Sequence, residues 1–247
     1  ALANSYNIPA VQVLRSIGVD YFLGFAERLG VRTLGRDASL YGPALTLGGG
    51  DMTLLELTRS YTVFANQGVL VNSTSILCVM DSQNVVIYEY ENGCPARGVH
   101  NNATIQRTGL GTQVLDPRIA FMITSILGDN AARTPAMGSN SPLYTPNIAS
   151  SVKTGTTDDF KDNWTVGYTR NVAVGVWVGN NNNDPMSNVS GLAGAAPIWN
   201  TVMNTVYNNP VYFDEFLVDG QHVSDAVNPP SGLTFTRICD VRTLTDP

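Results

Sequence analysis

The chain reads Ile148-Ala-Ser-Ser-Val-Lys-Thr-Gly-Thr156, then Asn163-Trp-Thr-Val-Gly-Tyr-Thr169, then Val172-Ala-Val-Gly-Val-Trp-Val-Gly179. These three runs are rich in Val, Thr and Trp, which favour strands, and short segments of turn residues separate them. Such spacing is typical of consecutive antiparallel strands joined by hairpins. We therefore predict a three-stranded antiparallel sheet within residues 148–179.

Helix signals lie on both sides of this sheet. The predicted helices begin at Pro9, at Asp20 with a stop at Gly30, at a capping box formed by Thr53 and Glu56, at Asp116-Pro117, and at Ala195. Residues 74–80 and 85–90 are expected to form a separate hairpin. Helices that precede and follow an antiparallel sheet indicate an α+β fold, with the sheet flanked by helices.

Composition excludes several classes of protein. The chain has 247 residues, 14 basic and 20 acidic, so its formal charge is 14 − 20 = −6. An acidic surface argues against a nucleic-acid backbone or an anionic lipid as the main partner. Hydrophobic residues make up 43% of the chain, which excludes disorder as the dominant state. No run reaches the roughly 18 uninterrupted apolar residues that a membrane span needs.

The three cysteines, Cys78, Cys94 and Cys239, are too few for a disulfide scaffold and lack the spacing of a zinc site. One bridge between Cys78 and Cys94 is one expectation, and three unpaired thiols is the other. We expect no metal site.

The most specific candidate for chemistry is Lys153-Thr154-Gly155-Thr156. A lysine on a strand places a compact positive charge beside a cleft, and threonine hydroxyls hold a carboxylate. Gly155 has no side chain, so a substrate backbone has room to lie against the strand. The structural alternative is an edge strand protected by a charged residue. Strict alternation places Lys153 and Thr154 on opposite faces, so a joint role requires local twist.

Ser5-Tyr6-Asn7 is the second candidate. A hydroxyl and an amide two positions apart are suited to relaying a proton and orienting a substrate amide. The structural alternative is that Ser5 and Asn7 cap the helix near Pro9.

In this order, the two motifs resemble part of a known signature. S-x-N followed by K-T-G, with S-x-x-K as the third member, is typical of penicillin-binding proteins and class A β-lactamases. Neighbouring segments are similar as well: Ala1-Leu-Ala-Asn-Ser-Tyr-Asn-Ile-Pro-Ala10, Leu47-Gly-Gly-Gly50, Asp162-Asn-Trp164, Val176-Trp-Val-Gly179 and Gly194-Ala-Ala-Pro-Ile-Trp199. Over residues 1–209 the chain resembles the transpeptidase domain of a class A, bifunctional penicillin-binding protein. Residues 210–247 are expected to be a linker or the start of an extension.

The resemblance implies an enzyme that cross-links peptidoglycan. Its partners would be stem peptides ending in D-Ala-D-Ala, and β-lactams; it implies no cofactor, and a location on the outer side of the bacterial cell membrane. An active-site serine would attack the penultimate D-Ala carbonyl, and an amine of a neighbouring stem would resolve the acyl-enzyme.

The resemblance also implies a role for each motif residue. Ser5 would shuttle a proton, and Asn7 would bind the amide side of the substrate. Lys153 would supply positive potential. The hydroxyls of Thr154 and Thr156 would bind the terminal carboxylate beside Gly155, and the Thr156 backbone N–H would form half of an oxyanion hole.

The chain departs from this pattern at the nucleophile. Ser150-Ser-Val-Lys153 matches the letters S-x-x-K, but that pair requires a helix, where positions i and i+3 share a face. We expect the helix with the nucleophile, and any glycosyltransferase domain and membrane anchor, to lie upstream of Ala1. The fold would then be incomplete at its N-terminus and the chain inactive alone. The alternatives are a non-catalytic envelope module that binds a peptide or partner, and a serine β-lactamase.

Overall fold

The computed structural model describes residues 1–83, 86–89, 111–187, 189–213, 217–218 and 221–236. At its centre is a three-stranded antiparallel sheet in the order β5-β6-β7. The strands are β5 (Ser151–Thr156), β6 (Asp162–Tyr168) and β7 (Ala173–Gly179). The strands predicted from residues 148–179 and their antiparallel pairing are confirmed.

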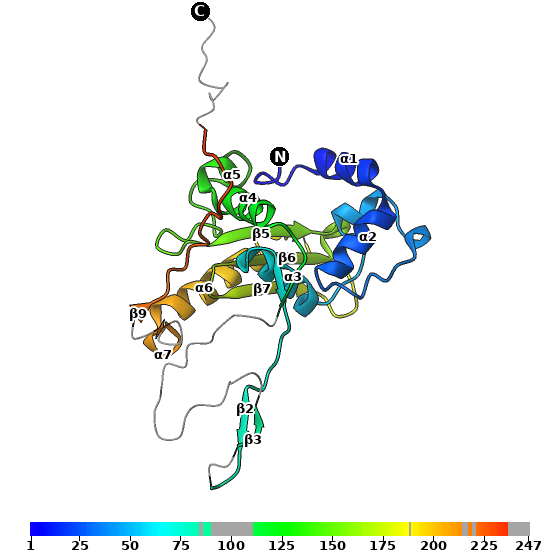
Figure 1. Ribbon diagram of the computed structural model, residues 1–247. Helices are drawn as coiled ribbons and strands as arrows, with labels where there is room; N and C mark the ends of the chain where they lie inside the picture. The colour runs from blue at the N-terminus through cyan, green and yellow to red at the C-terminus, as the bar shows by residue number, and fades with distance from the viewer. Residues whose placement is uncertain (84–85, 90–110, 188, 214–216, 219–220, 237–247) are drawn as a thin grey trace, which may run out of the picture.

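Helices cover both faces of this sheet (Figure 1). On one face lies α6 (Ala195–Asn208), whose fully buried Trp199 packs with Val152 of β5. On the other lies α3 (Leu54–Ala65), whose Phe64 ring stacks on Tyr168 of β6 at 6.2 Å. Alternate residues of the strands therefore meet different helices, which makes the sheet the core of an α+β fold.

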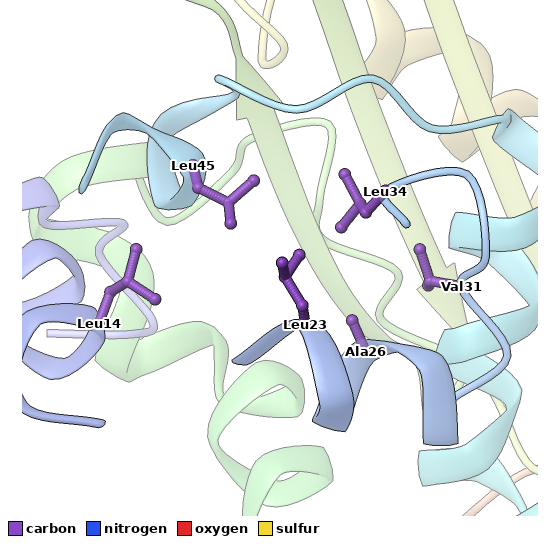
Figure 2. Close-up of a cluster of buried hydrophobic side chains, with 6 residues drawn as sticks. All are labelled: Leu14, Leu23, Ala26, Val31, Leu34 and Leu45. Atoms are coloured by element: carbon purple, nitrogen blue, oxygen red, sulfur yellow. The ribbon is translucent and has the colours of Figure 1, made fainter. Parts of the chain in front are cut away.

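The remaining helices lie around this core, and the last of them packs against α6. They are α1 (Asn7–Ile17), α2 (Val19–Arg28), α4 (Pro117–Gly128), α5 (Asn130–Met137) and α7 (Pro210–Phe213), with short 3-10 turns at Ala38–Leu40, Pro43–Leu47 and Asp158–Phe160. Leu14 of α1, Leu23 and Ala26 of α2, and Leu45 join one buried cluster (Figure 2). This cluster packs the two N-terminal helices against each other and against the segment that follows them. Among the residues that the structure describes, no helix has the length and apolar character to cross a bilayer.

The predicted helix starts agree with the structure at two caps and differ at one. The side chains of Thr53 and Asp116 accept hydrogen bonds from Glu56 N and Arg118 N, as expected of N-caps. Helix α1 begins two residues before Pro9, with Tyr6 as its N-cap. Pro9 fits there because the first N–H groups of a helix have no intrahelical partner.

Smaller two-stranded ribbons complete the described chain. They are β1 (Val69–Val71) with β4 (Gly111–Gln113), β2 (Cys78–Met80) with β3 (Val86–Glu89), and β8 (Leu217–Val218) with β9 (Gln221–His222). The β2–β3 pair confirms the predicted hairpin, although Asn84 of its turn lies outside the described residues. Cys78 is disulfide-bonded, so the expectation of three free thiols is wrong; Cys94 and Cys239 lie outside the described residues.

The contact between sheet and α6 yields a stability prediction. A Cβ added at Gly167 of β6 would lie 2.5 Å from the Trp199 ring and 2.9 Å from Val152 Cβ. We therefore expect Gly167→Ala to lower the free energy of unfolding by about 1–3 kcal/mol, measured by urea denaturation, because the core is overpacked. Gly42→Ala is the matched control, since a Cβ at Gly42 meets no atom within 4 Å. Equal effects of the two variants would contradict the packing described here.

Candidate active site

A cavity of about 1000 Å³ lies between the N-terminal residues, α3 and the central sheet. Its lining comes from segments far apart in the sequence: residues 1–22 in part, residues 45–61 in part, residues 153–158, and Asp162, Trp164, Val166 and Trp177. All six sequence-predicted site residues are in this lining: Ser5, Asn7, Lys153, Thr154, Gly155 and Thr156. The fold thus brings the two motifs to one cavity.

The two motifs meet directly through Ser5 and Lys153. Lys153 Nζ donates a hydrogen bond to Ser5 Oγ at 2.6 Å, across 148 residues of sequence. It donates a second to the carbonyl oxygen of Thr154 at 2.9 Å. An ammonium group with two oxygen acceptors holds a fixed position, and here it fixes the hydroxyl of Ser5 as well.

Burial changes the acid–base chemistry of this amine. Removal from water disfavours the charged form, which lowers the pKa of Lys153 from 10.5 to about 8. In the same cavity lining, burial raises the pKa of Tyr61 to about 12, so its hydroxyl stays neutral at physiological pH. The site therefore contains a lysine amine that exchanges its proton near neutral pH.

The position of β5 at the edge of the sheet explains how Lys153 and both threonines share one cavity. Across β5 and β6, Lys153 lies opposite Val166 and Thr154 lies opposite Thr165. The side chains of Lys153 and Thr154 are therefore on opposite faces of the sheet, as alternation predicts. Among the described strands β5 pairs only with β6, and five consecutive residues from Lys153 to Thr157 line the cavity. An unpaired edge is accessible from both faces, so the expected local twist is not required.

Thr156 makes a hydrogen bond that holds the end of β5 in place. Thr156 Oγ1 accepts a hydrogen bond from the backbone N–H of Gly191 at 2.9 Å, which ties the end of β5 to the loop before α6. On the opposite face of β5, a Cβ at Gly155 would lie 3.4 Å from Trp164 Cβ, an ordinary van der Waals contact. Both Gly155 and Thr156 line the cavity.

Ser5 adopts an unusual backbone conformation. Its φ angle is +58°, in the left-handed region that non-glycine residues rarely occupy. The N-cap of α1 is Tyr6, and the Ser5 hydroxyl contacts Lys153 instead. The alternative that Ser5 is a helix cap is therefore wrong. Asn7 is the first residue of α1 and is exposed at the cavity.

Ser150, the letter match to S-x-x-K, has a different environment. It is buried just before β5, and its hydroxyl pairs with Thr145 Oγ1 at 2.7 Å. Ser150 is not among the residues that line the cavity.

Sequence reasoning missed the tryptophan wall of the cavity. Trp164 and Trp177 lie on neighbouring strands with ring centroids 6.4 Å apart, and Trp177 Nε1 donates to Asp162 Oδ1 at 2.8 Å. Alternation was the available signal, because Trp164 and Val166 occupy the same face of β6. The glycine run at 48–50, which is part of the family resemblance, also lines the cavity at Gly48 and Gly50. Gly48 has φ +100°, and a Cβ there would lie 2.7 Å from Thr157 Cγ2.

Comparison with known proteins agrees with this geometry. A family model for the penicillin binding protein transpeptidase domain matches residues 1–204. The chain therefore belongs to the penicillin-binding protein transpeptidase family. Within that family, its relatives include class A penicillin-binding proteins of the 1A type.

The relatives are longer than this chain. Penicillin-binding protein 1A of Neisseria flavescens is 32% identical over 201 residues, which cover 81% of this chain and 23% of the relative. Penicillin-binding protein 4 of Bacillus subtilis is 27% identical over 209 residues, 84% of this chain and 30% of the relative. The chain thus spans less than a third of either protein.

Solved structures share the fold. Penicillin-binding protein 1A of Haemophilus influenzae aligns over 84% of this chain and 34% of its own, with 24% identity and a TM-score of 0.65. PonA1 of Mycobacterium tuberculosis, in complex with penicillin V, aligns over 84% of this chain and 56% of its own, with 17% identity and a TM-score of 0.66. The predicted fold class and family resemblance are confirmed.

We predict that the Lys153 amine titrates near pH 8. The chain has only two lysines, Lys153 and Lys161, so their side-chain amines give two NMR signals, and Lys161→Ala assigns them. Because the folded state releases the Lys153 proton at lower pH than the unfolded state, the free energy of unfolding should rise as pH increases from about 8 to 10.5. A titration midpoint of Lys153 near pH 10.5 would contradict the burial of this amine.

Proposed function

We propose that this domain is part of a D-Ala-D-Ala transpeptidase that cross-links peptidoglycan stem peptides through an acyl-serine intermediate. The observation that carries the proposal is the hydrogen bond from Lys153 Nζ to Ser5 Oγ, made inside a cavity between two motifs 148 residues apart. Family membership supports the class of reaction. Stem peptides and β-lactams are the proposed ligands, acting outside the cell membrane.

Each residue has a proposed role that its position allows. The Lys153 ammonium supplies positive charge to Ser5 and to the substrate's terminal carboxylate. Ser5 then passes a proton between the nucleophile and the leaving nitrogen, and a Lys153 pKa of about 8 suits that exchange. Thr154 and Thr156 bind the carboxylate, the Thr156 N–H donates to the oxyanion, and Asn7 binds the substrate amide.

We also propose that the nucleophile comes from outside this sequence. With lysines only at 153 and 161, the residues three positions earlier are Ser150 and Asp158, so Ser150 is the sole letter match. Its buried hydroxyl already pairs with Thr145, and Lys153 already contacts Ser5. A serine–lysine helix that enters the cavity from the parent protein would complete the site. Loss of a nucleophile removes most of an enzyme's rate enhancement.

The first test of this proposal is acylation by a fluorescent penicillin. We expect no covalent labelling of this 247-residue chain, and stoichiometric labelling of an N-terminally extended form that carries the serine–lysine helix. Slow, stable acylation of the extended form supports the transpeptidase, whereas rapid turnover of a chromogenic β-lactam would indicate a β-lactamase. Labelling of the short chain would contradict the external nucleophile. An unreactive extended form would favour a non-catalytic binding module.

The second test is Lys153→Ala in the extended form. Removing the charge beside Ser5 should slow penicillin acylation by about two to four orders of magnitude, the usual contribution of a positioned proton-transfer group. Lys161→Ala is the matched control, because Lys161 is the other lysine and is absent from the cavity lining. Unchanged acylation of the Lys153 variant would remove this lysine from the proposed mechanism.

A further inference from the structure

The residue before Ser5 makes an unusual pair of contacts with a distant helix. Asn4 Nδ2 donates a hydrogen bond to the carbonyl oxygen of Ala132 at 2.8 Å. Asn4 Oδ1 accepts one from the backbone N–H of Ala136 at 3.0 Å. Both partners lie in α5, so one side chain connects the N-terminal residues to a helix about 130 positions away; Figure 1 shows the N-terminus beside α5.

The two backbone groups that Asn4 contacts are four residues apart. In a regular α-helix, the N–H of residue 136 donates to the carbonyl of residue 132. Pro135 lies between them inside α5; proline has no N–H, and its ring clashes with the carbonyl four residues earlier. A turn disturbed in this way has room for an inserted polar group. The Asn4 carboxamide, with one donor and one acceptor, takes the place of a peptide group in that turn.

Helix α5 is itself held against α4. Arg133 is only 4% exposed and donates through Nη2 to the carbonyl of Leu127, in the last turn of α4, at 2.9 Å. Helix α4 is held in turn by Ser151 of β5, whose hydroxyl donates to the Thr124 carbonyl at 2.8 Å. The contacts therefore form a closed path from β5 through α4 and α5 to Asn4, then through Ser5 back to Lys153 of β5.

Ser5 depends on such a restraint. Its left-handed backbone is unfavourable for a residue with a Cβ. The N-terminal turn contributes two backbone hydrogen bonds, from Ser5 N to the Leu2 carbonyl at 3.1 Å and from Tyr6 N to the Ala1 carbonyl at 3.3 Å. Both are internal to the turn and do not fix it relative to the rest of the domain, whereas the Asn4 bridge fixes the residue next to Ser5 to α5 at two points.

We propose that Asn4 is a positioning residue for the Ser5–Lys153 pair, and that it acts by inserting its carboxamide into the turn of α5 disturbed by Pro135. The part of this inference that concerns catalysis rests on the proposed transpeptidase function. The part that concerns geometry does not. Three carboxyl groups, of Asp51, Asp158 and Asp162, also line the cavity, and none of them lies on the N-terminal turn.

The test compares Asn4→Ala with a matched control on the 247-residue chain. Asn200→Ala is the control, because the Asn200 carboxamide also donates to two backbone carbonyls, those of Pro142 and Tyr144, away from the cavity. In Asn4→Ala we expect at least tenfold faster hydrogen exchange at the Ala136 amide. We also expect the Lys153 midpoint to rise from about 8 toward 10.5, because the turn no longer excludes water from the amine. Asn200→Ala should change neither quantity.

Two further variants separate positioning from simple loss of structure. Asn4→Asp keeps the acceptor for Ala136 but loses the donor to Ala132, so its effects on both quantities should be intermediate. Ser5→Ala removes the acceptor of Lys153 without releasing the turn, so its Ala136 exchange should stay slow. In the extended form, Asn4→Ala should slow penicillin acylation by about 100-fold, the usual cost of a misplacement near 1 Å.

The outcomes distinguish this inference from the proposed function. If Asn4→Ala speeds hydrogen exchange at the Ala136 amide but leaves the Lys153 titration midpoint unchanged, Asn4 only stabilises α5 and the inference is overturned. So would unchanged Ala136 exchange in Asn4→Ala. An extended wild-type form that penicillin does not acylate would overturn the proposed function, while the exchange and midpoint measurements would still decide the role of Asn4.

Discussion

The hydrogen bond between the Lys153 ammonium and the Ser5 hydroxyl is the interaction on which the rest of the structure depends. Placing an ammonium in a cavity partly lined by tryptophan, tyrosine and leucine side chains costs free energy, and the pKa of about 8 reflects that cost. The charged form persists only if oxygen acceptors stand within reach at fixed distances. One acceptor is local, the Thr154 carbonyl, and the other must be delivered by a segment 148 residues away. Most of the fold serves to hold the Ser5 hydroxyl within hydrogen-bond distance of Lys153.

Two packing arrangements keep the lysine and the serine in register. On the strand side, Trp199 of α6 and the aromatic contact of Phe64 with Tyr168 hold β5 and β6 between two layers of helices. On the serine side, hydrogen bonds hold the turn in position, because residues 1–5 bury little apolar surface. Hydrogen bonds are directional, so an amide bridge fixes an orientation that apolar packing leaves free. Apolar burial therefore holds the strands β5 and β6, and directional hydrogen bonds hold the turn that carries Ser5.

The sequence predicted those parts of the fold whose signals are local. Strand alternation gave the three-stranded sheet, and Thr53 and Asp116 marked two helix starts through their own side chains. It also identified Lys153–Thr156 and Ser5 as facing one cavity, through resemblance rather than spacing. Helix α5 was missed, because Pro135 reads as a helix breaker and the group that completes its turn is Asn4. The tryptophan wall was missed because the strands were predicted without a pairing register, and the register is what places Trp164 opposite Trp177.

The edge position of β5 links the cavity to the proposed substrate. A central strand has both rows of backbone groups paired, and only its side chains reach a ligand. The described part of the sheet leaves one row of β5 unpaired beside the cavity, next to an ammonium and two threonines. An extended peptide that ends in a carboxylate matches this surface at both points, because its backbone adds to the strand edge while its terminus meets the positive charge. A substrate without an extended backbone would leave that row of backbone groups paired with water, so the edge agrees with the proposed peptide substrate.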